Sequence, residues 1–209
     1  MPLRALRKRK IAMKLKPEIL NGKRVILASK SPRRKELLSL ICDSFEVMPA
    51  DIDESVPQNV AAEEAAEYIS TQKAFAIDSE DVIIACDTVV IVDGKILGKP
   101  SDRQNGFEML SELSGKTHSV ISGVCIRYKG ESVSFSQKSL VTFYELTDEE
   151  INDYLDSGEP FDKAGGYGIQ GLGSLLVKEF SGDFFNIVGL PVARLRRSLS
   201  ELLSKAEEN

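Results

Sequence analysis

The 209-residue sequence contains no tryptophan, one histidine and three cysteines. Cys42, Cys86 and Cys125 are widely spaced and form no C-x-x-C pair, which argues against a disulfide scaffold or a zinc ribbon and favours a reducing compartment. The single histidine, His118, excludes any site that needs two, and we interpret it as a structural residue of a strand, without a partner. No apolar run approaches the ~20 residues of a membrane span, so we expect no membrane association. With 42% hydrophobic and 28% charged residues, the composition is that of a globular protein, and the length predicts one domain.

Basic charge is concentrated at the N-terminus. Residues 1–16 contain seven Lys or Arg and no acid, whereas residues 17–209 contain 20 basic and 32 acidic residues. The basic segment is typical of a transit-type segment, a nucleic-acid patch or a disordered leader ahead of a start at Met13, and we favour the leader. The acidic body argues against a nucleic-acid partner, because that binding depends on neutralising phosphates. We therefore predict a leader over 1–23, a domain over 24–206 and a cytoplasmic location, with organelle targeting by the leader left open.

Short apolar runs alternate with helical patterns along the body. We expect strands over 25–28, 45–48, 82–92, 118–128, 131–144 and 175–180, and helices over 32–38, 61–76, 102–113, 148–157 and from Pro191 onward. Asp93-Gly94 and Lys129-Gly130 are typical hairpin turns. The alternation lacks the regularity of a doubly wound fold and predicts a single α/β domain with a mixed sheet.

The junction Ser29-Lys30-Ser31-Pro32-Arg33-Arg34 has the features of an anion site. Ser31 suits an N-cap and Pro32 the first helical position, so free N–H groups and the positive end of the helix dipole would face a ligand. The glycines of a Walker P-loop are missing. The alternative is that Ser31 only caps the helix while the basic residues lie on a solvated turn, and the residues alone leave both interpretations open.

Four further segments carry side chains that suit phosphate chemistry. Asp87 follows a buried strand, where a carboxylate can hold Mg²⁺ or accept a proton from water, although a capping or turn Asp is the commoner explanation. The acidic loop 51–54 offers carboxylates to a hard cation, although a solvated loop is the favoured interpretation, and Lys99-Pro100 closes the Asp93-Gly94 hairpin. Residues 158–171 contain five glycines and Gln170, which offers both a donor and an acceptor; so long a segment without an obvious element favours function.

Taken together, these segments resemble the Maf family of nucleoside triphosphate pyrophosphatases over about residues 24–203. Eight motifs occur in the family's order: Leu27-Ala28-Ser29-Lys30-Ser31-Pro32-Arg33-Arg34, Glu54, Gln72-Lys73-Ala74, Cys86-Asp87-Thr88, Gly98-Lys99-Pro100, Leu113-Ser114-Gly115, Asp162-Lys163-Ala164-Gly165-Gly166-Tyr167-Gly168-Ile169-Gln170-Gly171 and Val188-Gly189-Leu190-Pro191. Cys86 and Gly166 stand where many members have Ala, and neither change touches the implied chemistry.

The resemblance implies metal-dependent hydrolysis of a nucleoside triphosphate to the monophosphate and pyrophosphate, with Mg²⁺ or Mn²⁺. It implies an elongated domain with a nucleotide cleft, similar to the inosine triphosphate pyrophosphatases, and a homodimer. The Arg, Thr and Gln at the substrate-choice positions imply the branch that prefers dTTP and UTP, with some modified pyrimidine nucleotides. By position, Asp87 matches the catalytic base, Glu54 and Asp87 the metal site, Ser29, Arg34, Lys73 and Lys99 the phosphate contacts, and Arg33, Thr88 and Gln170 the residues of substrate choice.

Two other function classes stay open at this point. A non-enzymatic nucleotide-binding regulator of cell division would need the binding residues but not the carboxylates Glu54 and Asp87. A nucleic-acid-binding module would depend on the leader alone.

Overall fold

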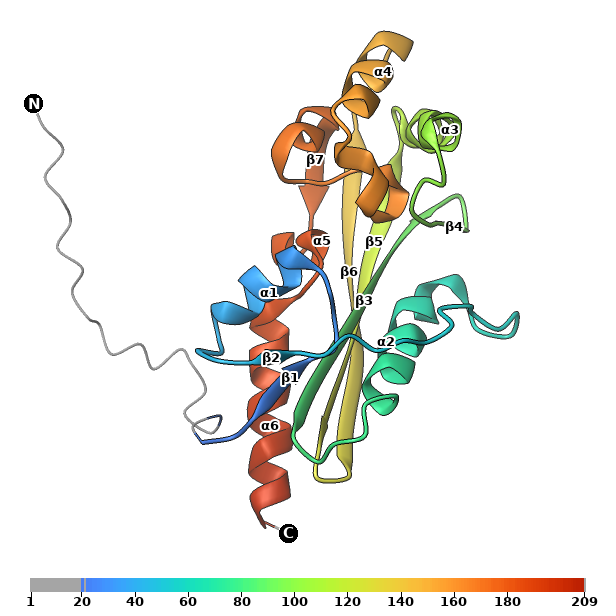
Figure 1. The fold of residues 1–209 in the computed structure, drawn as a ribbon. Helices are drawn as coiled ribbons and strands as arrows, with labels where there is room; N and C mark the ends of the chain where they lie inside the picture. The colour runs from blue at the N-terminus through green and yellow to red at the C-terminus, as the bar shows by residue number, and fades with distance from the viewer. Residues whose placement is uncertain (1–19, 21, 209) are drawn as a thin grey trace, which may run out of the picture.

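A mixed sheet runs the length of the molecule (Figure 1). The computed structural model describes residue 20 and residues 22–208. Its strands are β1 (Val25–Leu27), β2 (Glu46–Val47), β3 (Val82–Val92), β4 (Lys95–Leu97), β5 (Thr117–Tyr128), β6 (Glu131–Phe143) and β7 (Val177–Ser181). The strand order is β2-β1-β3-β5-β6-β7, with β4 also paired to β3. β1 is parallel to β2 and β3, and all other pairs are antiparallel, which confirms the predicted α/β fold with a mixed sheet.

The long strands β3, β5 and β6 follow from their sequence. β3 reads VIIACDTVVIV, a β-branched run that is buried on both faces, as a central strand requires. The predicted hairpin turns are confirmed at Asp93-Gly94, with φ of 49° and 78°, and at Lys129-Gly130, with φ of 47° and 81°. Two consecutive residues with positive φ give the turn twist that matches two antiparallel strands.

The described residues form six α-helices, and the first begins at the cap Ser31 that the sequence predicted. They are α1 (Pro32–Ser39), α2 (Ala65–Phe75), α3 (Arg103–Leu113), α4 (Asp148–Asp156), α5 (Phe184–Val188) and α6 (Val192–Glu208). Ser31 caps α1 with Pro32 in its first turn, and Thr147 and Glu150 form a capping box on α4. The sequence patterns missed α5, which is short and capped by Asp183, and the 3₁₀ turns Glu159–Asp162, Ala164–Gly166 and Gly171–Leu176 inside the glycine-rich region.

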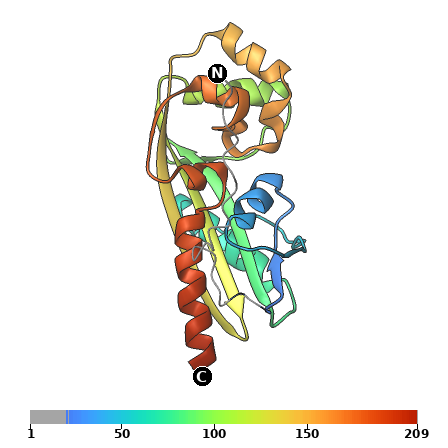
Figure 2. The ribbon, with the colours of Figure 1, turned by 90° about the vertical axis from the view of Figure 1, so that its left-hand side faces the viewer.

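Helices cover both faces of the sheet (Figures 1 and 2). α2 packs Ala65, Ala66 and Ala74 on one face, and α1 and α6 bury Leu38, Leu195 and other leucines on the opposite face. α2 approaches β5 so closely that a Cβ on Gly123 would lie 2.2 Å from the Ala66 carbonyl carbon. Gly123 therefore permits the contact that sets the position of α2.

The far end of the long strands carries a second group of elements. α3, α4 and the segment 158–176 gather there, apart from α1 and α2 (Figure 2). Gly165 N donates to Gly98 O at 2.9 Å, and its Cα lies against Val90, so the glycine-rich segment is held on β3 and the end of β4. The space between this group and α1 is the cleft described below.

The predictions about a leader and its targeting role concern residues 1–19 and 21, which lie outside the described residues. Leu20 is buried in the core, and Lys23 pairs with Glu207 of α6 at 2.5 Å. Within residues 22–208, no helix combines the length and apolarity required to cross a bilayer.

Candidate active site

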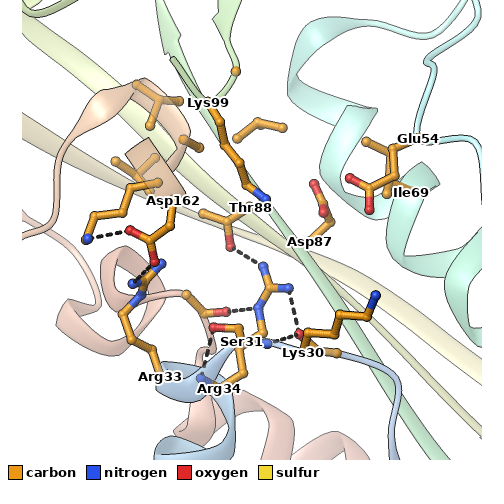
Figure 3. A pocket seen from close by; sticks show the side chains of 18 of the residues that line it. Lys30, Ser31, Arg33, Arg34, Glu54, Ile69, Asp87, Thr88, Lys99 and Asp162 are labelled. Atoms are coloured by element: carbon orange, nitrogen blue, oxygen red, sulfur yellow. Dashed lines mark hydrogen bonds and ion pairs between the residues drawn. The ribbon is translucent and has the colours of Figure 1, made fainter. Parts of the chain in front are cut away.

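One cleft of about 760 Å³ contains every site residue that the sequence predicted (Figure 3). Its walls come from the β1–α1 junction, the loop before α2, α2, the middle of β3, the end of β4 and the segments 162–170 and 187–189. The predicted residues that line it are Ser29, Arg33, Arg34, Glu54, Lys73, Asp87, Thr88, Lys99 and Gln170. A volume of this size is within the range of about 300–1,000 Å³ that is usual for small-molecule sites.

The cleft exists because two short strands leave a gap along one edge of β3. β1 pairs with β3 only from Val82 to Ile84, and β4 pairs with the same strand only from Val90 to Val92. The stretch around Asp87 and Thr88 lies between these pairings, at the carboxyl end of parallel β1. Ligands of open α/β sheets bind at such positions.

Strand alternation separates the two residues at this gap. Asp87 points to the α2 face, where Lys73 Nζ donates to its Oδ1 at 2.7 Å, and Lys73 Nζ also lies 2.8 Å from Glu54 Oε1. The Lys73 and Asp87 side chains are 10% and 13% exposed, whereas Glu54 is 56% exposed. A single ammonium therefore joins two carboxylates at the floor of the cleft, one of them largely buried and the other half exposed.

Thr88 points to the other face, toward Arg34. The Arg34 guanidinium donates from Nε to Gly189 O at 3.0 Å, from Nη1 to Ser29 Oγ at 3.2 Å and from Nη2 to Thr88 Oγ1 at 3.0 Å. Thr88 Oγ1 also bonds Ser122 Oγ at 2.9 Å. Since a guanidinium has five N–H groups, one on each of Nη1 and Nη2 is still available to an anion. Arg34 thus ties β1, β3 and the turn after α5 together at the mouth of the cleft.

Arg33 reaches across the cleft to the glycine-rich segment. Its Nη1 donates to Asp162 Oδ2 at 3.1 Å, and Lys163 Nζ donates to Asp162 Oδ1 at 2.6 Å. Burial opposes ionisation of Asp162, but the hydrogen bonds from Lys163 and Arg33 outweigh it, so the pKa of Asp162 is lowered. The Arg33–Asp162 ion pair links the wall of the cleft formed by α1 to the wall formed by the glycine-rich segment.

Three side chains that can donate hydrogen bonds face the cleft without an ion pair or hydrogen bond to other described residues. Lys99 extends from the connection between β4 and α3 toward the space beside Asp87 (Figure 3), and Lys30 and Gln170 are also exposed. A ligand can therefore bind these groups without breaking an ion pair or hydrogen bond among the described residues.

The donor set fits a hard divalent cation that takes its other ligands from a substrate. At the floor of the cleft, the carboxylates of Glu54 and Asp87 both contact the Lys73 ammonium, which places them close to each other. Over the described residues there is no group of three or more His, Cys, Asp or Glu that would hold a metal without help. Two carboxylates are nevertheless what Mg²⁺ uses when phosphate oxygens and water complete its shell.

Cys86 and His118 lie close to the cleft, and from the sequence we interpreted His118 as structural. Cys86 is buried, burial raises the pKa of its thiol, and its Sγ donates to Gly189 O at 3.2 Å, which agrees with an apolar filler that makes one weak bond. For His118 the expected absence of a partner is wrong. Its Nε2 lies 2.7 Å from Tyr167 Oη, because the glycine-rich segment folds back onto the start of β5.

Sequence reasoning did not assign site roles to Asp162, Lys163 and the Gly189 carbonyl. All three lie within the quoted motifs, but nothing local indicated that they would face Arg33 and Arg34 across the cleft. Pairing between residues more than a hundred positions apart is decided by the fold.

Comparison with known proteins adds three findings. The family model described as "Maf-like protein" matches residues 24–202. The dTTP/UTP pyrophosphatase of Thermosipho africanus is 50% identical over 172 residues, covering 82% of this chain and 90% of that protein; that of Bacillus cereus is 46% identical over 182 residues, covering 86% and 95%. A solved structure of the Staphylococcus aureus Ham1 protein aligns with a TM-score of 0.42 at 17% identity, over 59% of this chain and 73% of that one.

Proposed function

The chain belongs to the Maf-like protein family, and from that premise we propose that it hydrolyses dTTP and UTP to the monophosphate and pyrophosphate. One observation carries the proposal: a buried Lys73–Asp87 pair, with Glu54, stands at the floor of a cleft whose rim carries Arg33, Arg34 and Lys99. A triphosphate needs positive charge along its chain and a base near one phosphorus. The cleft offers both in one place.

In this proposal Asp87 accepts the proton as water attacks the α-phosphorus. The leaving pyrophosphate gains negative charge, which Lys73, Lys99 and the free N–H groups of Arg34 stabilise from fixed positions. Because Lys73 already holds Asp87 by a hydrogen bond, the carboxylate is oriented before substrate arrives. Catalysis of this kind depends mainly on positioning and charge.

Glu54 and Asp87 are the residues that would hold Mg²⁺ or Mn²⁺. When bound, such an ion neutralises phosphate charge and polarises the phosphoryl oxygens. This chain's part is to present two carboxylate oxygens within reach of one another and to leave the remaining positions to the nucleotide.

Substrate choice would fall to Gln170 and Arg33. The Gln170 amide is exposed in the cleft, and its donor and acceptor match a pyrimidine edge. A site built for such bonds discriminates against bases that leave its polar groups unpaired.

The proposal includes three further points, each to be measured separately. They are activity on modified pyrimidine triphosphates, a homodimer and a cytoplasmic location.

The experiment is release of pyrophosphate from a panel of nucleoside triphosphates, with Mg²⁺ and with EDTA. We expect turnover of dTTP and UTP above the purine nucleotides, lost in EDTA. Asp87→Asn should reduce turnover about 10²–10⁴-fold, as removal of a general base does. Asp93→Asn makes the same chemical change in the β3–β4 turn and should leave turnover unchanged.

Two results would contradict the proposal. Nucleotide binding without turnover by the native chain would favour the regulator, and affinity for DNA or RNA alone would favour the nucleic-acid module. Wild-type turnover in a folded Asp87→Asn protein would remove Asp87 from the role of base.

A further inference from the structure

The histidine that the proposed mechanism does not use lies directly behind the cleft. His118 is 2% exposed on β5, and its Nε2 is 2.7 Å from the hydroxyl of Tyr167. His118, Tyr167 and Phe143 also pack edge to face, with ring centroids 4.7 to 5.3 Å apart. Tyr167 lines the cleft, whereas His118 is one layer deeper.

Packing alone does not explain why a histidine occupies position 118. Its Nδ1 is buried and has no hydrogen-bond partner among the described residues, and burial lowers the pKa of the imidazole to about 4. An unpaired buried polar atom loses its hydrogen bonds to water without replacement, so an apolar side chain of similar size would give a more stable core. The imidazole forms a hydrogen bond with the Tyr167 hydroxyl, which an apolar side chain could not form.

The segment held by that bond is the one that carries Gln170. Residues 165–173 contain five glycines with positive φ or tight packing, and the segment is fixed at several points. Tyr154 Oη accepts from Gly168 N at 3.2 Å, and Glu159 accepts from Leu172 N and Gly173 N at 3.0 and 3.3 Å. Tyr167 and Ile169 are both buried in the core, and Tyr167, three residues before Gln170, also binds the sheet by a side-chain hydrogen bond to His118.

We propose that His118 is a positioning residue for substrate choice: through Tyr167 it fixes the segment 165–173 and so places the Gln170 amide against the base. The inference rests on the proposed function, since it assumes that the cleft distinguishes bases. His118 itself touches neither the base nor the phosphates.

The bond has a preferred direction. If Tyr167 donates to Nε2, only the Nδ1–H remains unpaired; in the reverse arrangement both the Nδ1 lone pair and the hydroxyl hydrogen remain unpaired. The first arrangement leaves fewer buried groups unsatisfied, so the imidazole is neutral with its proton on Nδ1. Because the chain has one histidine, nitrogen NMR reports this tautomer without overlap.

The variants separate positioning from stability. His118→Leu and Tyr167→Phe each remove the bond, and His118→Gln keeps a polar atom near the place of Nε2. Ile126→Val is the matched control, because it removes one methylene group from a fully buried residue on the same strand and lowers stability by an amount comparable to a lost hydrogen bond.

The first measurement is the ratio of kcat/KM for dTTP to that for dATP. The affinities of the protein for dTTP and for dATP are also measured by calorimetry, which gives an affinity ratio. We expect His118→Leu and Tyr167→Phe each to lower the ratio about three- to tenfold, the double variant to lower it no further, and His118→Gln to restore most of it. Ile126→Val should leave the ratio at the native value while lowering stability.

The second measurement is amide hydrogen exchange, which does not depend on turnover. Residues 165–173 should exchange faster in His118→Leu than in Ile126→Val, whereas α6 should be the same in both. Equal exchange of the segment in the two variants, or a ratio that falls equally in Ile126→Val, would overturn the inference. A native protein that binds nucleotide without turnover would overturn the proposed function alone, because the affinity ratio and the exchange would still test His118.

Discussion

The stability of this protein should depend on pH through its one histidine. Burial lowers the pKa of His118 from 6.5 to about 4. In the unfolded chain the imidazole takes up a proton below pH 6.5, whereas in the folded protein it stays neutral until about pH 4. The unfolded state therefore binds more protons over this interval, and the free energy of unfolding falls as the pH falls from 6.5 toward 4.

The magnitude follows from the two pKa values. At pH 7.5 both states are neutral at His118 and the group contributes nothing to the pH dependence. At pH 5 the unfolded imidazole is almost fully protonated and the folded one is not, so the free energy of unfolding is lower by about 2 kcal/mol. For a chain of this length that corresponds to a melting temperature lower by about 4–8 °C.

The assay is urea unfolding at pH 7.5 and pH 5 of the native chain and of His118→Gln, whose side chain does not titrate. Carboxylates that titrate near pH 5 contribute equally to both proteins and cancel in the difference. The native chain should lose about 2 kcal/mol more than the variant between the two pH values. Equal losses in the two proteins would refute the reasoning, because they would mean that His118 is protonated in the folded state or exposed to water.

Two substitutions test the packing that forms the cleft. Lys73→Met leaves the Asp87 carboxylate, with 13% of its side chain exposed, without its cation, and should cost about 3 kcal/mol in thermal unfolding. Adding Asp87→Asn should recover most of that loss, and an equally unstable double variant would show that the unpaired carboxylate is not the source of the loss. Gly123→Ala places a Cβ 2.2 Å from the Ala66 carbonyl carbon and should cost about 4 kcal/mol or more, whereas Gly98→Ala meets no atom within 4 Å and should cost under about 1 kcal/mol in urea unfolding.

Much of the fold followed from local patterns. The β-branched run 82–92, the Asp93-Gly94 turn and the Ser31-Pro32 start of α1 depend on interactions within a few residues, and the structure confirms all three. The helix α5 was missed because five residues between Asp183 and Gly189 carry too little periodicity to distinguish them from a loop.

The candidate site was predictable as a set of residues but not as an arrangement. The motifs named Ser29, Glu54, Lys73, Asp87 and the others, and one cleft contains them all. Only the tertiary structure decided that Lys73 holds Asp87 and Glu54 together, and that Asp87 and Thr88 serve opposite faces of β3.

The physical reason is the range of the interactions. Capping, turn formation and hydrophobic alternation are determined by near neighbours in the chain, so the amino-acid sequence determined the elements and the inventory of polar groups. The contacts of Arg33 with Asp162 and of His118 with Tyr167 join residues 129 and 49 positions apart. Such contacts form only after the sheet order, the gap between β1 and β4 and the close approach at Gly123 have brought distant segments together.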